Sequence, residues 1–188
     1  MKIVFATGNP HKLEEVNFIA KDSDIEFILP AVGFNPIEDG STFEENSLKK
    51  AQEAYRVSGM MSLADDSGLC IEALNGAPGL YSARYAGSQA EKIERILREL
   101  DGIENRKAKF VCCMTLLDNN GKMIYQTTGE CHGSIIKEAK GVNGFGYDPV
   151  FMPEGYNITI AEMSEDKKNQ ISHRANALHD VINYLESL

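Results

Sequence analysis

Two adjacent acids, Asp65 and Asp66, follow a short apolar run and precede a serine and a glycine. The apolar run over residues 60–64 predicts a buried strand, and the Ser-Gly pair predicts a turn at its end. Ligands of open α/β sheets bind just beyond strand ends, so this position favours a functional site. Neighbouring carboxylates repel each other, and a hard cation such as Mg²⁺ removes that conflict. A solvated turn after an ordinary strand would give the same pattern.

Composition limits the classes of protein to which the chain can belong. Its 188 residues favour a single domain spanning residues 1–188, with room for two lobes on one sheet. The formal net charge of −9 argues against non-specific binding of nucleic acid, which needs a basic surface. An acidic protein can still bind a phosphorylated small molecule if it gathers its cations locally and uses a metal.

The cysteines and the first residues indicate the compartment. The four cysteines have no zinc-ligand spacing and are typical of reduced thiols in a cytoplasmic protein. The first apolar run is too short for a signal peptide or a membrane span, so no membrane association is expected.

The first 20 residues predict a strand, a glycine turn and a helix. Residues 3–6 form the apolar run, Asn9 suits the N-cap, and Pro10 suits the first helical position. Such a unit points free backbone N–H groups outward and can hold an anion. Lys12 lies in the first helical turn, where a cation opposes the helix dipole unless a phosphate binds there. A solvated lysine beside an ordinary turn is the alternative.

The remaining periodicity predicts further strands and helices. Strands are expected at residues 25–29, 69–71, 110–117, 122–136, 150–151 and 158–160, with a hairpin turn at 119–121. Helices are expected from Ser41 or Thr42 to residue 58, over residues 88–100, and over residues 164–188. The last helix is either continuous or restarts at Ser172. In the second case His173 and Arg174 lie in a first turn, where a ligand rich in acceptors would account for them.

A glycine-rich segment over residues 141–149 contains Phe145 and Tyr147. Glycines let a backbone pass close to a flat group, and an aromatic ring can stack on any nucleobase. The alternative is a surface loop whose aromatic rings are buried in the core. Together with the anion turn, the acids and the cations Lys50, Lys168 and Arg174, this segment predicts a nucleoside triphosphate site.

Five motifs of the chain resemble the inosine triphosphate pyrophosphatase family, whose members are also called XTP/dITP diphosphatases. They lie at residues 7–12, 64–68, 77–85, 144–149 and 172–175, in the family's order and over nearly the whole chain. The resemblance implies an α/β fold with an elongated mixed sheet, flanking helices, and two lobes with the active site in the cleft between them. It also implies Mg²⁺-dependent hydrolysis of ITP, dITP and XTP to the monophosphate and pyrophosphate, and a homodimer.

The resemblance also implies roles for single residues. Asp66 would be the catalytic base and, with Glu38, a metal ligand, while Asp65 would be a supporting catalytic acid. The residues implied to bind the triphosphate are Thr7, Gly8, Asn9, Pro10, His11, Lys12, Lys50 and Lys168. Those implied to contact the rest of the substrate are Ser67, Phe145, Gly146, Tyr147, Asp148, His173 and Arg174.

Two departures from the family pattern occur, at residues 60–61 and 138–140, and neither falls on an implied catalytic position. The register of Glu38 is the least certain, because the loop that carries it varies in length. Two other functions fit the same residues: a Mg²⁺-dependent pyrophosphatase for another nucleotide, such as a modified pyrimidine, and a nucleotide sensor without turnover. The intact acid pair favours an enzyme, because a sensor needs no carboxylate to activate water.

Overall fold

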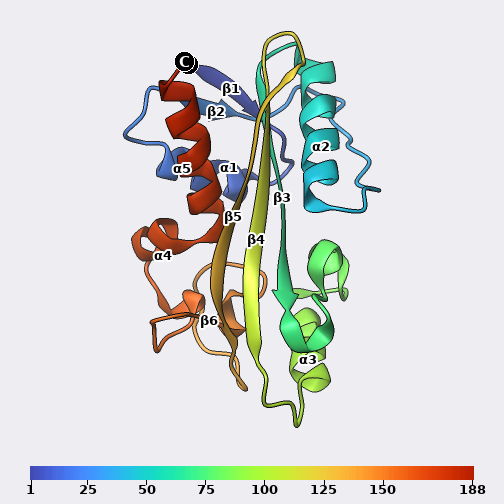
Figure 1. Cartoon of the computed structure of the whole chain (residues 1–188), viewed down its shortest axis with the longest axis vertical. Coiled ribbons are helices and arrows are strands. Elements are labelled where there is room, and N and C mark those ends of the chain that lie inside the picture. Colours follow the sequence, from blue (N-terminus) through green and yellow to red (C-terminus); the bar gives the residue numbers. More distant parts are fainter. The chain divides into compact units, whose positions relative to one another are not determined.

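The computed structural model describes all 188 residues and contains one six-stranded sheet in the order β2-β1-β3-β4-β5-β6 (Figure 1). Strand β1 pairs in parallel with β2 and β3, whereas β5 pairs antiparallel with β6, so the sheet is mixed. The strands are β1 Lys2–Phe5, β2 Glu26–Ile28, β3 Ser62–Ile71, β4 Lys107–Leu117, β5 Met123–Ile135 and β6 Phe151–Pro153. The predicted α/β class with a mixed sheet and flanking helices is confirmed.

Five α-helices accompany the sheet, and none is both long and apolar enough to cross a membrane. They are α1 Pro10–Ile19, α2 Phe43–Ser58, α3 Gln89–Glu99, α4 Glu165–Ile171 and α5 His173–Glu186. Four short 3-10 turns, η1 to η4, cover Glu72–Leu74, Gly79–Arg84, Asp148–Val150 and Ile160–Glu162.

The predicted caps start the first helices. The Asn9 side chain accepts a hydrogen bond from the backbone N–H of His11 at 3.0 Å. Of the two candidates for the start of α2, Thr42 is the cap, and its hydroxyl accepts from the N–H of Glu45. Each cap satisfies a backbone donor that the helix cannot satisfy itself.

The chain divides into two compact units. The first comprises residues 1–66, 112–129 and 174–188, and the second comprises residues 67–111 and 130–173. Strands β3, β4 and β5 each contribute residues to both units.

The first unit has a core on each face of its part of the sheet. On β1, Ile3 and Phe5 pack with residues of α1 and α5, whereas Val4 packs with Ala51 and Ala54 of α2. This split follows from the strand period of two, which sends successive side chains to opposite faces. Helices α1 and α5 therefore cover one face and α2 covers the other (Figure 1).

The core of the second unit joins α3 to its strands. Ile96 and Leu100 pack with Leu69, Phe110 and Phe151, all of them buried. Arg106 ties this unit together by donating to the backbone carbonyls of Leu100, Ile135 and Ile136.

Two expected features differ in the structure. Strand β3 continues through residues 65–68 to Ile71, so the turn expected after Asp66 is absent and residues 69–71 belong to the same strand. The acids remain inside the strand because cations from neighbouring helices face them, as described below. Residues 158–160 do not form the expected strand. Instead Ile160 begins the 3-10 turn over residues 160–162, closed by reciprocal hydrogen bonds between Thr159 and Glu162.

The C-terminal helical segment is interrupted. Ser172 has extended backbone angles (φ −67°, ψ 155°), so α4 ends before it and α5 begins at His173. Of the two alternatives, the restart at Ser172 is confirmed. His173 and Arg174 therefore occupy the first turn of α5.

Candidate active site

The first turn of α1 is open. The Thr7 hydroxyl accepts from the N–H of Asn9 at 3.0 Å, which bends the chain after β1. A Cβ placed on Gly8 would meet nothing within 4 Å, and residues 8–11 are exposed. The His11 ring is 84% exposed and lies 3.7 Å from a Glu14 oxygen. The strand-turn-helix unit predicted as an anion site is present.

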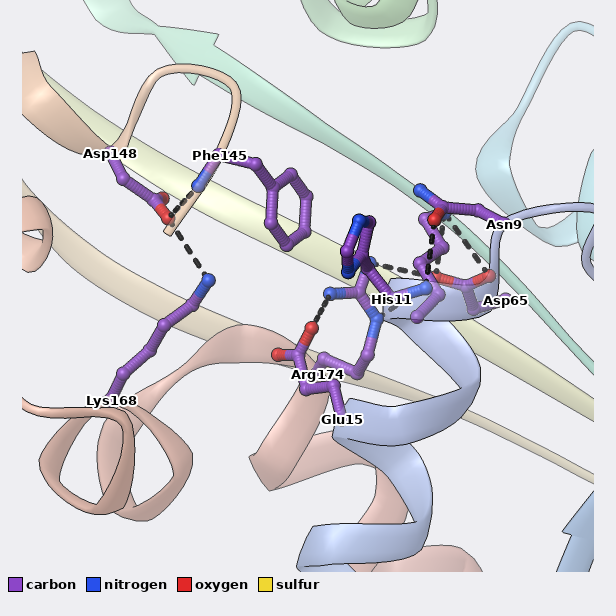
Figure 2. Close-up of polar contacts among 9 residues, drawn as sticks. Asn9, His11, Glu15, Asp65, Phe145, Asp148, Lys168 and Arg174 are labelled. Carbon is purple, nitrogen blue, oxygen red and sulfur yellow. Dashed lines mark hydrogen bonds and ion pairs between the residues drawn. The ribbon is translucent and has the colours of Figure 1, made fainter. Parts of the chain in front are cut away.

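Arg174 lies between two carboxylates in the interior of the first unit (Figure 2). Its Nε and one terminal nitrogen donate to Asp65 Oδ2 at 3.2 and 3.0 Å, and its other terminal nitrogen donates to Glu15 Oε2 at 3.0 Å. Lys12 Nζ lies 3.4 Å from the same Asp65 oxygen. Helices α1 and α5 therefore deliver two cations to one side chain of β3.

The cations determine the charge state of Asp65. Burial alone would raise its pKa, but the charges of Lys12 and Arg174 hold the pKa of Asp65 well below its ordinary value. Burial lowers the pKa of Lys12, and Asp65 opposes that effect. Burial also disfavours a charged Arg174, yet Asp65 and Glu15 raise the pKa of Arg174. Asp65 is therefore ionised at neutral pH inside an ion-pair network.

Asp66 lies in a different environment. Burial is the largest cause that raises the pKa of Asp66 to about 6, and the negative charges of Asp65 and Glu38 add to it. Lys50 and a hydrogen bond with the Asn46 side chain, both from α2, act in the opposite direction. A carboxyl group with such a pKa is ionised at neutral pH and still basic enough to accept a proton.

Glu38 reaches the same group of residues through Lys50. Lys50 Nζ lies 3.3 Å from Glu38 Oε1, and the Lys50 side chain is only 10% exposed. Burial would lower the pKa of Lys50, but the charges of Asp65 and Glu38 outweigh it and raise that pKa. Glu38, whose register was uncertain in the sequence, therefore lies beside Lys50 of α2.

The donor set fits one class of metal. No group of three or more His, Cys, Asp or Glu side chains is arranged to hold an ion by itself. Mg²⁺ binds through one or two carboxylates together with substrate phosphates and waters. Asp66 and Glu38, with Lys50 near both, match that requirement.

The second unit contains a separate cluster around Asp148 (Figure 2). Asp148 Oδ2 accepts from Lys168 Nζ at 2.9 Å and from the backbone N–H of Phe145 at 3.1 Å. Lys168 Nζ also lies over the Phe145 ring, 4.3 Å from its centroid. The glycine-rich loop is thus fixed by one buried carboxylate, and Phe145 remains 39% exposed.

Other predicted residues of the second unit serve its packing. Tyr147 is buried in the core, and its hydroxyl donates to the Ser82 carbonyl at 2.6 Å. The His173 ring stacks on Phe110 with centroids 4.8 Å apart. Gly146 adopts a left-handed backbone (φ +62°), which its lack of a Cβ allows. Ser67 follows Asp66 in β3 and is half-buried.

The structure sorts the predicted residues into two groups. The first unit brings together Glu38, Lys12, Lys50, Asp65, Asp66 and Arg174, with residues 7–11 at the start of α1. The second unit contains Ser67, Phe145, Gly146, Tyr147, Asp148, Lys168 and His173. Sequence reasoning missed Glu15 and Asn46. Each is a buried polar residue within a helix, and its partner lies outside that helix.

Comparison with known proteins identifies the family of the chain. Residues 3–184 match the Ham1 family. The chain belongs to that family. Ham1 membership confirms the resemblance found in the motifs, because relatives of this chain carry the name dITP/XTP pyrophosphatase.

Two such relatives match almost end to end. The protein of Prochlorococcus marinus (strain NATL1A) is 45% identical over 186 residues, which covers 99% of this chain and 94% of the relative. The protein of Treponema denticola is 42% identical over 196 residues and 99% of each chain. The solved Ham1 protein of Staphylococcus aureus superposes with a TM-score of 0.88 at 38% identity, covering 100% of this chain and 99% of that one.

Proposed function

We propose that this Ham1 protein hydrolyses the deaminated purine nucleoside triphosphates ITP, dITP and XTP to the monophosphate and pyrophosphate. The names of its relatives support the substrate class. The observation that carries the chemistry is the difference between two neighbouring carboxylates: Asp65 is neutralised by Lys12 and Arg174, whereas the pKa of Asp66 is raised to about 6. In many enzymes two neighbouring acids have different pKa values because their environments differ, and this difference gives each acid its own role.

We propose Mg²⁺ as the cofactor, held by Asp66 and Glu38. The ion would neutralise phosphate charge and lower the pKa of bound water, which are general contributions of metal ions to hydrolysis. The oxygen donors and their number suit this ion.

The residues of the first unit then act on the triphosphate and the water. Asp66 accepts a proton from the attacking water, a contribution worth about a hundredfold or more in rate. Lys12 and Lys50, with Lys168 of the second unit, supply positive charge to the phosphates and to the leaving pyrophosphate. Asp65 is the supporting acid, because it holds Lys12 while itself staying ionised. The open backbone of residues 7–11 offers N–H donors to phosphate oxygens.

The second unit would provide the nucleobase contacts. Phe145 offers an exposed ring for stacking, and Asp148 with Lys168 fixes the loop that carries it. We assign Ser67, Gly146, Tyr147 and His173 to this part of the substrate. Arg174 acts in the first unit, where it holds Asp65 and Glu15. Tyr147 would contribute through its backbone and through the shape of the loop, because its side chain lies in the core.

Release of pyrophosphate from a panel of nucleotides tests the proposed function. We expect rapid release from dITP, ITP and XTP with Mg²⁺ and a kcat/KM with ATP that is lower by roughly a hundredfold. A pocket built for a 6-oxopurine leaves two hydrogen-bonding groups unpaired against adenine, at a cost of about 1–3 kcal/mol each. Nucleotide binding without pyrophosphate release would favour a sensor. Preference for a pyrimidine would favour the other class of pyrophosphatase.

We further propose that residues 1–188 form one catalytic domain and that the protein is a cytoplasmic homodimer. The family match over residues 3–184 supports the single domain. Four cysteines without a disulfide support a reducing compartment. The net charge of −9 argues against a nucleic acid partner, which would need a basic surface. A small anionic substrate whose charge is neutralised by a metal ion does not need such a surface. Light scattering during size-exclusion chromatography would test the dimer.

A further inference from the structure

Asn46 is a buried polar side chain in the first turn of α2. It is only 3% exposed, although asparagine is a weak helix former and its amide is costly to bury without hydrogen bonds. The amide has one partner on the loop and faces a second group. Its oxygen accepts from the backbone N–H of Gly40 at 2.8 Å. The side chain also lies near the carboxyl group of Asp66, whose pKa it lowers.

The oxygen contact holds the loop that carries Glu38. Gly40 lies two residues beyond Glu38, and a Cβ on Gly40 would lie 2.7 Å from Asn46 Oδ1 and 2.8 Å from Glu45 Cβ. The loop therefore touches the helix at a point where only glycine fits. The N–H of Ser41 adds a hydrogen bond of 2.6 Å to Glu45 Oε2.

One helical turn later, Lys50 completes the same face of α2. Residues four apart lie above one another on a helix, so Asn46 and Lys50 face the same way. Lys50 contacts the Glu38 side chain itself at 3.3 Å. Lys50 thus holds the Glu38 carboxylate by charge, while Asn46 fixes the loop backbone and lies near Asp66.

We propose that Asn46 is a positioning residue that sets the spacing between Glu38 and Asp66 before a metal binds. This inference rests on the proposed function, in which those two carboxylates hold the ion. Partners that orient ligating carboxylates are typically worth 10- to 100-fold in metal affinity. The single amide of Asn46 serves both proposed ligands. It holds the loop that carries Glu38, and it lies near Asp66 of β3.

The test measures Mn²⁺ binding to the nucleotide-free protein by electron paramagnetic resonance, and the Mg²⁺ activation constant with dITP. Asn46→Leu removes both contacts while filling the space, and we expect it to weaken Mn²⁺ binding about 10- to 100-fold. Gly40→Ala disturbs only the loop contact and should weaken binding less. We expect kcat at saturating Mg²⁺ to fall less than the activation constant rises, because the catalytic groups remain.

Lys49→Ala is the matched control. Lys49 forms an ion pair with Asp39, so it also joins this loop to α2, but both side chains are exposed and face solvent. We expect its Mn²⁺ affinity to equal that of the wild type. A general loss of loop contact would affect Lys49→Ala and Gly40→Ala alike and would contradict the inference.

Other outcomes separate the inference from the proposed function. Unchanged Mn²⁺ affinity in folded Asn46→Leu, or in Gly40→Ala if Asn46→Leu does not fold, overturns the role of Asn46 even if the enzyme is a pyrophosphatase. Wild-type protein that binds Mn²⁺ but releases no pyrophosphate refutes the proposed function and leaves the positioning test decisive. Wild-type protein that binds no Mn²⁺ in the absence of nucleotide refutes the inference, because no metal site is then set before the substrate binds. Pyrophosphate release still decides the proposed function in that case.

Discussion

Asp65 and Asp66 are sequence neighbours in β3, yet their side chains meet different helices. Asp65 pairs with Lys12 of α1 and Arg174 of α5, whereas Asp66 faces Asn46 and Lys50 of α2. The pleat of a strand explains this, because successive side chains point to opposite faces. Two chemically identical groups thereby acquire opposite pKa shifts, and the same substitution at each should have opposite effects on stability.

We predict that Asp66→Asn nearly abolishes turnover and stabilises the metal-free protein. The change keeps the shape but removes the proposed base, which costs at least about a hundredfold in rate. It also removes a carboxylate that is unfavourable to ionise in the folded state, with a pKa of about 6 against an ordinary 3.8. At about 1.4 kcal/mol per pKa unit, the upper limit of the gain is about 3 kcal/mol at pH 8.

The pH dependence of that gain has a defined sign. Between pH 4 and pH 6 the folded protein binds a proton at Asp66 that the unfolded chain releases, so the free energy of unfolding falls as pH rises through this window. The difference between Asp66→Asn and the wild type should therefore grow from pH 4 to pH 6 and vanish below pH 4. Urea unfolding in EDTA at several pH values measures it, and a gain that persists at pH 3.5 would contradict the assignment.

We predict the opposite effect for Asp65→Asn. Asp65 is fully buried and paired with two cations, so its loss leaves Arg174 and Lys12 without their main partner. Breaking a buried ion pair on one side typically costs about 3–5 kcal/mol. The folded-state pKa of Asp65 is depressed, so the cost should be present above pH 4 and decline as pH falls below that value. Equal stability of Asp65→Asn and the wild type at pH 8 would show that the network contributes nothing.

Local signals in the sequence predicted much of the fold. Asn9 and Thr42 start helices because their side chains satisfy donors only two or three residues away. The prediction of a turn after Asp66 was wrong, because the conformation there depends on contacts from distant parts of the chain. An acid pair can stay within a strand only if cations reach it, and Arg174 lies 109 residues after its partner Asp65 in the chain. No local pattern contains that information.

The residues of the candidate site divide in the same way between local and distant signals. Chemistry that short motifs carry, such as the acids and the open first turn of α1, could be found in the sequence. Glu15 and Asn46 could not, because their importance comes from partners outside their own helices. Arg174 is the partner of Glu15, whereas Asn46 contacts Gly40 in the preceding loop and lies near Asp66 of β3. In the sequence, the only signal for either residue would have been a polar residue at a position that the helical pattern places on the buried face.

We predict that activity depends on Mg²⁺ and is lost in excess EDTA. Mn²⁺ should substitute in part because it shares hard oxygen ligands, whereas Ca²⁺ should support little activity because it prefers more ligands at longer distances. Pyrophosphate release at fixed dITP, with each ion titrated into metal-free enzyme, gives the order. Full activity in EDTA would remove the proposed metal role of Asp66 and Glu38.

We predict that Asp148→Asn loosens the glycine-rich loop. The carboxylate joins Lys168 to the backbone of Phe145, and charge-assisted hydrogen bonds of this kind are worth about 1.5–3 kcal/mol. The substitution should raise KM for dITP more than it lowers kcat, because the loop lies among the proposed base contacts. Steady-state kinetics with amide exchange over residues 141–149 measures both effects. Unchanged exchange would show that Asp148 does not hold the loop.

The last prediction concerns how the nucleobase is distinguished. Arg174→Ala would be a poor probe, because it strips Asp65 and Glu15 of their shared partner and should lower activity on every nucleotide. Phe145→Ala is cleaner, because that ring is 39% exposed and contributes little to the core. Base stacking is worth about 1–3 kcal/mol and is similar for all bases. We therefore expect KM to rise roughly 5- to 150-fold for ITP, XTP and ATP alike. Val142→Ala, in the same loop and 95% exposed, is the matched control and should leave KM unchanged. A selective loss of ITP hydrolysis in Phe145→Ala would mean that the ring discriminates between bases, and stacking alone would then be the wrong account of this residue.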